Sequence, residues 1–298
     1  MCFDAELLRN RIRKSTQLAR SRNLAWRPQL PRQTPVEFCA LCRKHGAPGI
    51  SVSTISEAQR LAESDISSIL ITLPPAFSEL RHVRRIPQTT ELLFTVDHFV
   101  QVERIASQDQ SLRNGHRVLI LIQTDKRGPG IRPGPDALRL AQGVSLLPGI
   151  QVVGITAGFS SAGYSRPVIN SVRHTQQQFR EVGICCDLVS VAGTADDFAV
   201  NGSVVTEIRD RTLLRTTGRE RPLVWLEAEV ISRPSLEFAV ISGGPDLWGW
   251  QTSLWLPDFP DAQVSNSNDG CCVVKATGTA QQLKIGDVVR VARTDSTK

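Results

Sequence analysis

The fold is decided by a strand–helix–strand stretch: Val118-Leu119-Ile120-Leu121-Ile122, a helical pattern over 135–143, and then Val152-Val153-Gly154-Ile155. Both short runs are almost wholly apolar, which is typical of strands that are covered on both faces. The helix between them supplies the length that the chain needs to return and add the second strand in parallel, through a right-handed crossover. The stretch therefore predicts a parallel α/β sheet.

The same alternation covers the first two-thirds of the chain. Further strand patterns lie at 24–27, 49–52, 69–72, 92–96 and 188–191, and further helical patterns at 4–22, 35–45, 56–62, 77–84, 98–107 and 167–182. These seven strand patterns come close to the eight that close a (β/α)8 barrel. The pattern predicts such a TIM-like barrel over residues 1–200.

After residue 200 the strand patterns follow one another without helices. They lie at 203–208, 223–231, 238–241, 272–275 and 288–292, and turn residues such as Gly286-Asp287 separate them. This organisation predicts a smaller antiparallel β domain over residues 201–298.

The composition excludes several classes of protein. A chain of 298 residues with 41% hydrophobic residues can bury the cores of two domains, and no run of about 18 apolar residues predicts a membrane span. The start has no basic leader, so we expect a cytoplasmic protein with reduced thiols at its seven cysteines. The net charge of +6 is scattered, and its densest cluster, Arg81, Arg84 and Arg85, is interpreted as a solvated helix face. We expect no nucleic-acid partner.

Cys39, Cys42 and His45 form the one motif with metal-ligand spacing. No second Cys or His pair matches it, and the neighbours Phe38 and Leu41 are apolar. We therefore interpret the motif as a core-facing helix with two small buried thiols.

The opening of the chain carries a family resemblance. Phe3-Asp4-Ala5-Glu6-Leu7-Leu8-Arg9-Asn10 and Arg27-Pro28-Gln29-Leu30-Pro31-Arg32-Gln33-Thr34-Pro35 resemble the first strand–helix–strand of the D-threonine aldolase/D-serine dehydratase family. Pieces in matching order continue to about Val291; among them are 95–97, 130–134, 191–194, 205–209, 230–235 and 283–287. The resemblance implies a fold type III architecture for pyridoxal phosphate (PLP), with an alanine-racemase-like barrel, a β domain and a homodimer.

The departures from the family fall on its chemistry. Its second strand ends in Arg-Pro-His-x-Lys-Thr-His, and that lysine forms the Schiff base with PLP; here Gln29 stands at the first histidine and Pro31 at the lysine. A proline has no amine for an imine. The His-containing turn is replaced by 158–165, and the phosphate loop by 191–197, where Asp196 and Asp197 would repel an anion. The family's zinc or manganese ligands near the C-terminus have no counterpart, so we expect no metal and no bound cofactor.

These departures favour a repurposed, PLP-independent enzyme that acts on a small polar or anionic metabolite at the barrel mouth, by lyase, dehydratase or isomerase chemistry. Acid, base and an enolate-stabilising cation suffice for such reactions. The candidate catalytic residues are Asp125, Lys126, Tyr164 and Arg27. The candidate substrate- or anion-binding residues are Gln29, Arg32, Gln33, Arg127, Ser160, Ser165, Gly193, Thr194 and Asp196.

Two alternatives stay open. The first is a non-catalytic pseudoenzyme that binds a ligand or partner, with Trp248, Trp250 and Trp255 either at an interface or in the β-domain core. The second is an amino-acid lyase that holds PLP non-covalently, through the backbone of Gly193 and Thr194, or on the relocated lysine Lys126.

Overall fold

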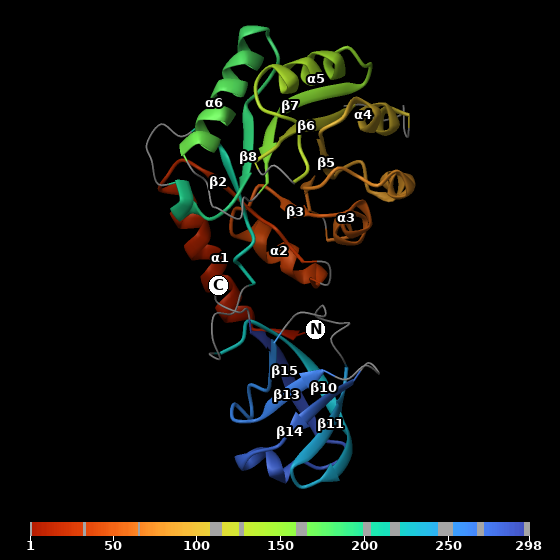
Figure 1. Cartoon of the computed structure of the whole chain (residues 1–298), viewed down its shortest axis with the longest axis vertical. Helices are drawn as coiled ribbons and strands as arrows, with labels where there is room; N and C mark the ends of the chain where they lie inside the picture. Colours follow the sequence, from red (N-terminus) through yellow and green to blue (C-terminus); the bar gives the residue numbers. More distant parts are fainter. Residues whose placement is uncertain are drawn as a thin grey trace. The chain divides into compact units, whose positions relative to one another are not determined.

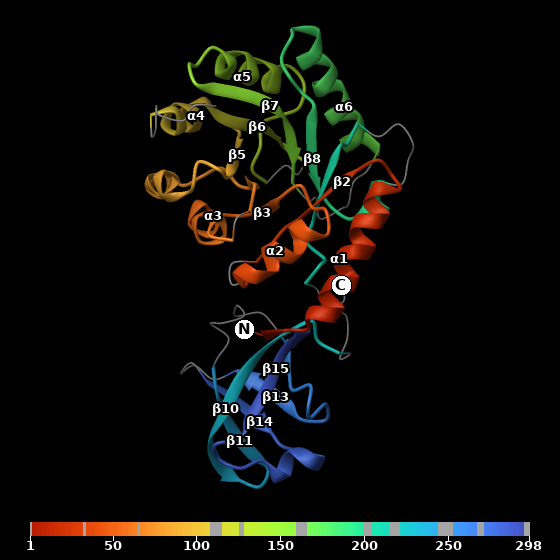
Figure 2. The same cartoon turned by 180° about the vertical axis from the view of Figure 1, so that it is seen from behind.

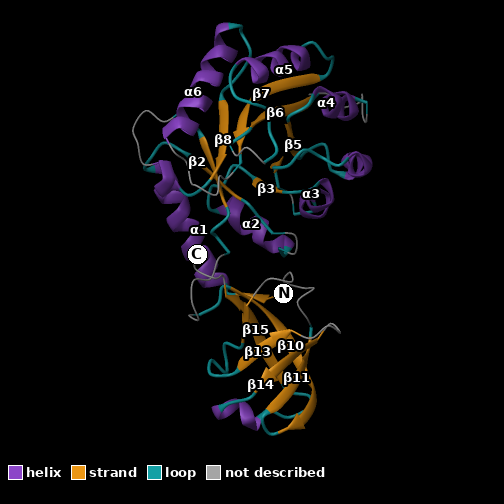
Figure 3. Ribbon diagram, viewed as in Figure 1, coloured by secondary structure: helices purple, strands orange, loops and turns teal. Residues whose placement is uncertain are grey.

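A computed structural model describes residues 2–31, 34–64, 66–107, 115–124, 128–158, 166–198, 204–214, 221–243, 253–266 and 271–294. The chain divides into two compact units. One is Arg11–Leu213, and the other combines Met1–Asn10 with Leu214–Lys298. Helices are concentrated in the first unit and strands dominate the second (Figure 3).

The first unit is a closed parallel barrel, as predicted. Its strands pair in chain order, each parallel to the next (Figure 1). The bridge between Gln29 and Ser51 joins the first strand to the second and closes the sheet. The strands are β2 (Ala25–Pro28), β3 (Ile50–Val52), β4 (Ser68–Ile71), β5 (Glu91–Val96), β6 (His116–Ile122), β7 (Ile150–Ala157), β8 (Leu188–Ala192) and β9 (Glu207–Asp210).

Helices connect successive strands on the outside of the barrel (Figures 1 and 2). Where a helix was expected over 77–84, the chain forms the 3-10 helix η1 (Phe77–Arg85), whose buried Leu80 and Val83 are three residues apart and so suit a three-residue turn. The helices are α1 (Ala5–Arg20), α2 (Val36–Lys44), α3 (Ile55–Ala62), α4 (Phe99–Ala106), α5 (Pro135–Ser145) and α6 (Arg166–Glu181).

The predicted domain boundary at residue 200 was wrong. The strand pattern over 203–208, assigned to the β domain, belongs to β9, which lies between β8 and β2 in the barrel and is parallel to both. Among the described residues between β8 and β9, the helical part is the four-residue 3-10 helix η2 (Ala195–Phe198), which is too short to give a helical pattern in the sequence. Strand composition does not say which sheet a strand joins, and here the closure of the barrel decides it.

The second unit is antiparallel, as predicted. Its strand order is β12-β15-β10-β11-β14-β13, and β1 (Cys2–Phe3) pairs with β10. Its core includes Val230, Ile241, Val274 and Val291, all buried. The strands are β10 (Val224–Ser235), β11 (Phe238–Ser242), β12 (Ser253–Trp255), β13 (Gln263–Asn266), β14 (Cys271–Lys275) and β15 (Val288–Thr294).

The structure bears on the expectations for the tryptophans and for membrane-spanning helices. Trp255 is buried, whereas Trp248 and Trp250 lie outside the described residues. Among the helices that the structure describes, none combines the length and apolar character needed to cross a membrane.

Candidate functional site

The carboxyl ends of the barrel strands form the mouth, where enzymes with this architecture carry their chemistry. Of the predicted site residues, the structure describes Arg27, Gln29, Gly193, Thr194 and Asp196. The others lie outside the described residues and stay predictions: Arg32, Gln33, Asp125, Lys126, Arg127, Ser160, Tyr164 and Ser165.

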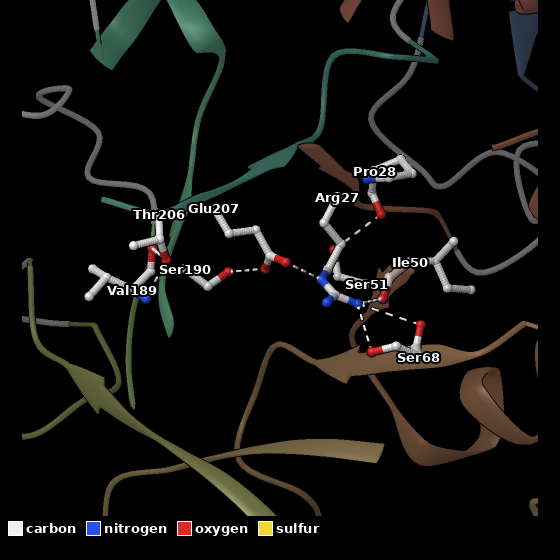
Figure 4. A network of polar contacts seen from close by, with 9 residues as sticks. All are labelled: Arg27, Pro28, Ile50, Ser51, Ser68, Val189, Ser190, Thr206 and Glu207. Carbon is white, nitrogen blue, oxygen red and sulfur yellow. Dashed lines mark hydrogen bonds and ion pairs between the residues drawn. The ribbon is translucent and has the colours of Figure 1, made fainter. Parts of the chain in front are cut away.

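Arg27 points into the barrel, where its guanidinium group is almost wholly enclosed (Figure 4). Its Nε donates to Glu207 Oε2 at 2.9 Å, and both side chains are nearly inaccessible, at 4% and 2% exposure. Its Nη1 donates to the carbonyl of Ile50 and to Ser68 Oγ, both at 3.2 Å. The charge and several donors of Arg27 are therefore committed to the chain itself, which suits a role in holding β2, β3, β4 and β9 together.

Glu207 is the partner that sequence reasoning did not single out. Besides Arg27, it accepts a hydrogen bond from Ser190 Oγ at 2.7 Å, so one carboxylate links β2, β8 and β9 (Figure 4). A buried carboxylate needs such compensation. The available signal was three charged residues, among them Glu207, within one short strand, together with an arginine in the otherwise apolar strand β2.

The end of β2 brings Gln29 and Pro31 to the mouth. Gln29 donates its backbone N–H to the carbonyl of Asp210 at 2.8 Å and forms the bridge to Ser51. The carbonyl of Pro31 accepts bonds from the N–H and the hydroxyl of Thr34, at 3.1 and 2.7 Å. Pro31 thus shapes a local turn and offers no nucleophile to the mouth.

The turn after β8 is satisfied by the chain's own groups. The N–H of Gly193 donates to the carbonyl of Arg209 at 3.0 Å. The N–H and the hydroxyl of Thr194 both donate to Asp197 Oδ2, at 2.7 and 2.9 Å. The neighbouring carboxylate, Asp196, is ion-paired with Arg22 at 2.9 Å. A carboxylate therefore already occupies the position that an anion would take at Thr194.

A surface pocket of about 620 Å³ opens beside the mouth, between the ends of β5 and β6 and the start of α5. Asp97 stabilises one side of this pocket. Its two carboxylate oxygens accept hydrogen bonds from the backbone N–H of Gly130 at 2.8 Å and from the side-chain amide of Gln101 at 2.7 Å. Asp136 is ion-paired with Arg132 at 2.7 Å and also with Arg139. The two exposed guanidinium groups give the pocket donors for an anionic ligand.

Cys39 and Cys42 face the core from α2, as the buried-helix interpretation predicted. Burial raises the pKa of the Cys39 thiol to about 11, and it raises the pKa of Cys42 further. Both groups are therefore protonated at neutral pH, unlike the thiolates that bind metal. Within the described ranges, no three His, Cys, Asp or Glu side chains are grouped closely enough to hold a metal ion.

Residues 33–210 match the family model for the alanine racemase N-terminal domain. The chain belongs to this family. The matched range runs from the turn after β2 to the end of β9 and so covers most of the barrel of this alanine-racemase-type protein.

Known relatives agree with this assignment. The chain is 24% identical over 222 residues to D-threo-3-hydroxyaspartate dehydratase of Delftia sp. (strain HT23); the match covers 70% of this chain but only 58% of that protein. D-threonine aldolase from Filomicrobium marinum has a similar structure, with a TM-score of 0.81, 18% identity, and coverage of 98% of this chain and 85% of that one. Alanine racemase of Clostridium difficile 630 gives a TM-score of 0.75 at 15% identity, with coverage of 97% and 84%. At these identities the structural matches show a shared fold.

Members of this family use PLP, so the described residues can be tested for their fit to it. The cofactor needs an amine for its aldehyde and donors for its phosphate. Pro31 has no amine, and the donors of Gly193 and Thr194 are taken by the Arg209 carbonyl and by Asp197. The described residues at the ends of β2 and β8 therefore do not fit this cofactor.

Proposed function

We propose that this alanine-racemase-type chain works without PLP, as a repurposed enzyme that acts on a small polar or anionic metabolite at the barrel mouth. The observation that carries the proposal is that the N–H and the hydroxyl of Thr194 both donate hydrogen bonds to the Asp197 carboxylate. An incoming phosphate would have to displace a carboxylate of like charge that the backbone already holds. The lack of an amine at Pro31 supports the same conclusion.

Acid–base chemistry of the lyase, dehydratase or isomerase type suits the remaining groups. In this proposal Asp125 is the general base, Tyr164 the acid, and Lys126 holds the anionic group of the substrate. Asp196 is the weaker candidate for the base, because Arg22 already binds it at 2.9 Å. Arg27 serves to position the strands rather than to contact substrate, since its guanidinium is enclosed in the barrel.

Titration of the purified protein with PLP tests the proposal. We expect no imine absorbance and no peptide labelled after borohydride reduction, because the end of β2 offers no amine and the donors of Gly193 and Thr194 after β8 are already bonded. A reduced adduct at Lys126, or at any other lysine, would refute cofactor independence and restore an amino-acid lyase or racemase.

A non-catalytic binding protein is the second candidate. The burial of Arg27 favours it, because one of the four candidate catalytic groups is committed to the barrel interior. The Asp125→Asn variant separates the two candidates once a metabolite that stabilises the protein against heat has been found. Loss of that metabolite's turnover, with binding retained, supports the enzyme, whereas binding without turnover by the unmodified protein supports the binding protein.

A further inference from the structure

The interior of the barrel is arranged in levels. Because barrel strands tilt, inward-facing residues of alternate strands share a level, with about four side chains in each. According to the strand registers, one such level near the mouth takes one residue from each of the four alternate strands β3, β5, β7 and β9. Its members are Ser51, Thr95, Thr156 and Arg209.

The inward direction of this level follows from its neighbours. Leu70, Leu93 and Leu119 pack into one cluster inside the barrel. Leu93 lies two residues before Thr95 on β5, so their side chains share a face. On β9, Glu207 lies two residues before Arg209 and meets Arg27 and Ser190 inside the barrel.

This level is polar although it is fully enclosed. Ser51, Thr95 and Thr156 are 0% exposed and Arg209 is 1% exposed. Bulky branched apolar side chains fill such levels in ordinary TIM barrels. Three small hydroxyl side chains and one guanidinium replace them here, so the level supplies donors where a packed barrel needs none.

Two of its hydroxyls have no hydrogen-bond partner among the residues that the structure describes. Within the described part of the chain, neither Thr95 Oγ1 nor Thr156 Oγ1 makes a hydrogen bond. Ser51 Oγ, by contrast, donates to the carbonyl of Pro28 at 3.2 Å. Buried hydroxyls in native proteins are nearly always satisfied by protein, water or a ligand, so these two donors indicate a polar group bound at this level.

Arg209 brings positive charge to the same place. Its Nη2 donates to the carbonyl of Ala157 at 2.5 Å, so the guanidinium reaches across to the end of β7 beside Thr156. The register partner of Arg209 on β8 is Ala192, a small side chain on the next level. A guanidinium and two hydroxyl donors on one level of the barrel match the needs of a carboxylate.

We propose that Thr95, Thr156 and Arg209 bind the carboxylate of a small ligand inside the barrel, directly below the mouth. The inference rests on the proposed function, since it assigns a carboxylate of that metabolite to these three side chains, in addition to the anionic group assigned to Lys126. In an enclosed site each hydrogen bond to the charge is strengthened, because no water competes for it.

Calorimetric titration of the purified protein with sodium acetate, and with its neutral isostere acetamide, tests the inference. We expect acetate to bind and acetamide to bind more weakly. Thr95→Val and Thr156→Val, which keep the side-chain shape, should each weaken acetate binding by about tenfold or more, as expected for the loss of a hydrogen bond to a charged group. The melting temperature without ligand should stay unchanged or rise, because an unsatisfied hydroxyl is removed.

The matched control is Thr90→Val. The Thr90 hydroxyl is also buried, but it donates to the carbonyl of Ile66 at 2.9 Å. This variant should lower the melting temperature and leave acetate affinity unchanged. Thr156→Ser, which keeps the hydroxyl, should retain acetate binding and serves if a valine variant does not fold.

Equal acetate affinity in the unmodified protein and both valine variants would overturn the inference, and so would the absence of acetate binding by the unmodified protein. Neither outcome bears on the PLP titration. A PLP adduct combined with acetate binding that still depends on Thr156 would refute the proposed function alone.

Discussion

The Glu207→Gln variant tests the central ion pair of the barrel. The substitution keeps the size of the side chain and an oxygen that accepts from Arg27 Nε, but it removes the negative charge. At an effective dielectric constant of about 20, unit charges 2.9 Å apart attract by about 6 kcal/mol. Arg27 retains its bonds to the Ile50 carbonyl and Ser68 Oγ, which offset part of this loss. We therefore expect a loss of about 3 kcal/mol, at the lower end of the range for breaking a buried pair.

Urea unfolding followed by far-ultraviolet circular dichroism measures this loss, because α2 to α6 lie in the barrel unit and dominate the signal. The control is Glu91→Gln, which breaks the pair with Arg117 at 39% and 33% exposure and should cost less than about 1 kcal/mol. The double variant Arg27→Met with Glu207→Leu should recover most of the loss, since neither charge of this pair is left buried without its partner. A Glu207→Gln variant as stable as Glu91→Gln, or a double variant no better than the single one, would refute the reasoning.

Three further predictions concern other parts of the chain. Gly154→Ala should prevent barrel formation, because a Cβ there would overlap a backbone carbonyl of β8; a folded variant in circular dichroism would contradict this. A thiol reagent at neutral pH should label exposed Cys185 before Cys39, whose pKa burial raises to about 11; equal labelling rates by peptide mapping would count against the buried assignment. The hydrogen bond from Arg290 lowers the pKa of Asp258, so this pair should stabilise the β unit above the ordinary carboxyl pKa and lose that contribution as the pH falls through the lowered value. Asp258→Asn should reduce the acid dependence of unfolding of this unit, and an unchanged pH profile would rule the pair out as its source.

Much of the architecture was predictable because its signals are local. Apolar runs of strand length alternate with helical periodicity from β2 to β8, and this alternation alone indicates a parallel barrel. The strand at Glu207–Asp210 was recognised as a strand but placed in the wrong domain. One partner, β2, lies far away in sequence, and the other, β8, is joined to β9 without a helical pattern in the sequence, so no local pattern identifies either of them.

The candidate site was predictable in composition and not in arrangement. The sequence by itself determined that proline follows β2, that two aspartates follow Gly193-Thr194, and that the strands bear isolated polar residues. Only the tertiary structure decided that Arg27 forms an ion pair with Glu207 and that Asp197 accepts the hydrogen bonds of Thr194. It also decided that Thr95, Thr156 and Arg209 lie on one enclosed level of the barrel. The reason is that the sequence gives the chemical type of each side chain directly. Which side chains meet across the barrel depends on strand register and tilt, and these are fixed only when the whole sheet closes.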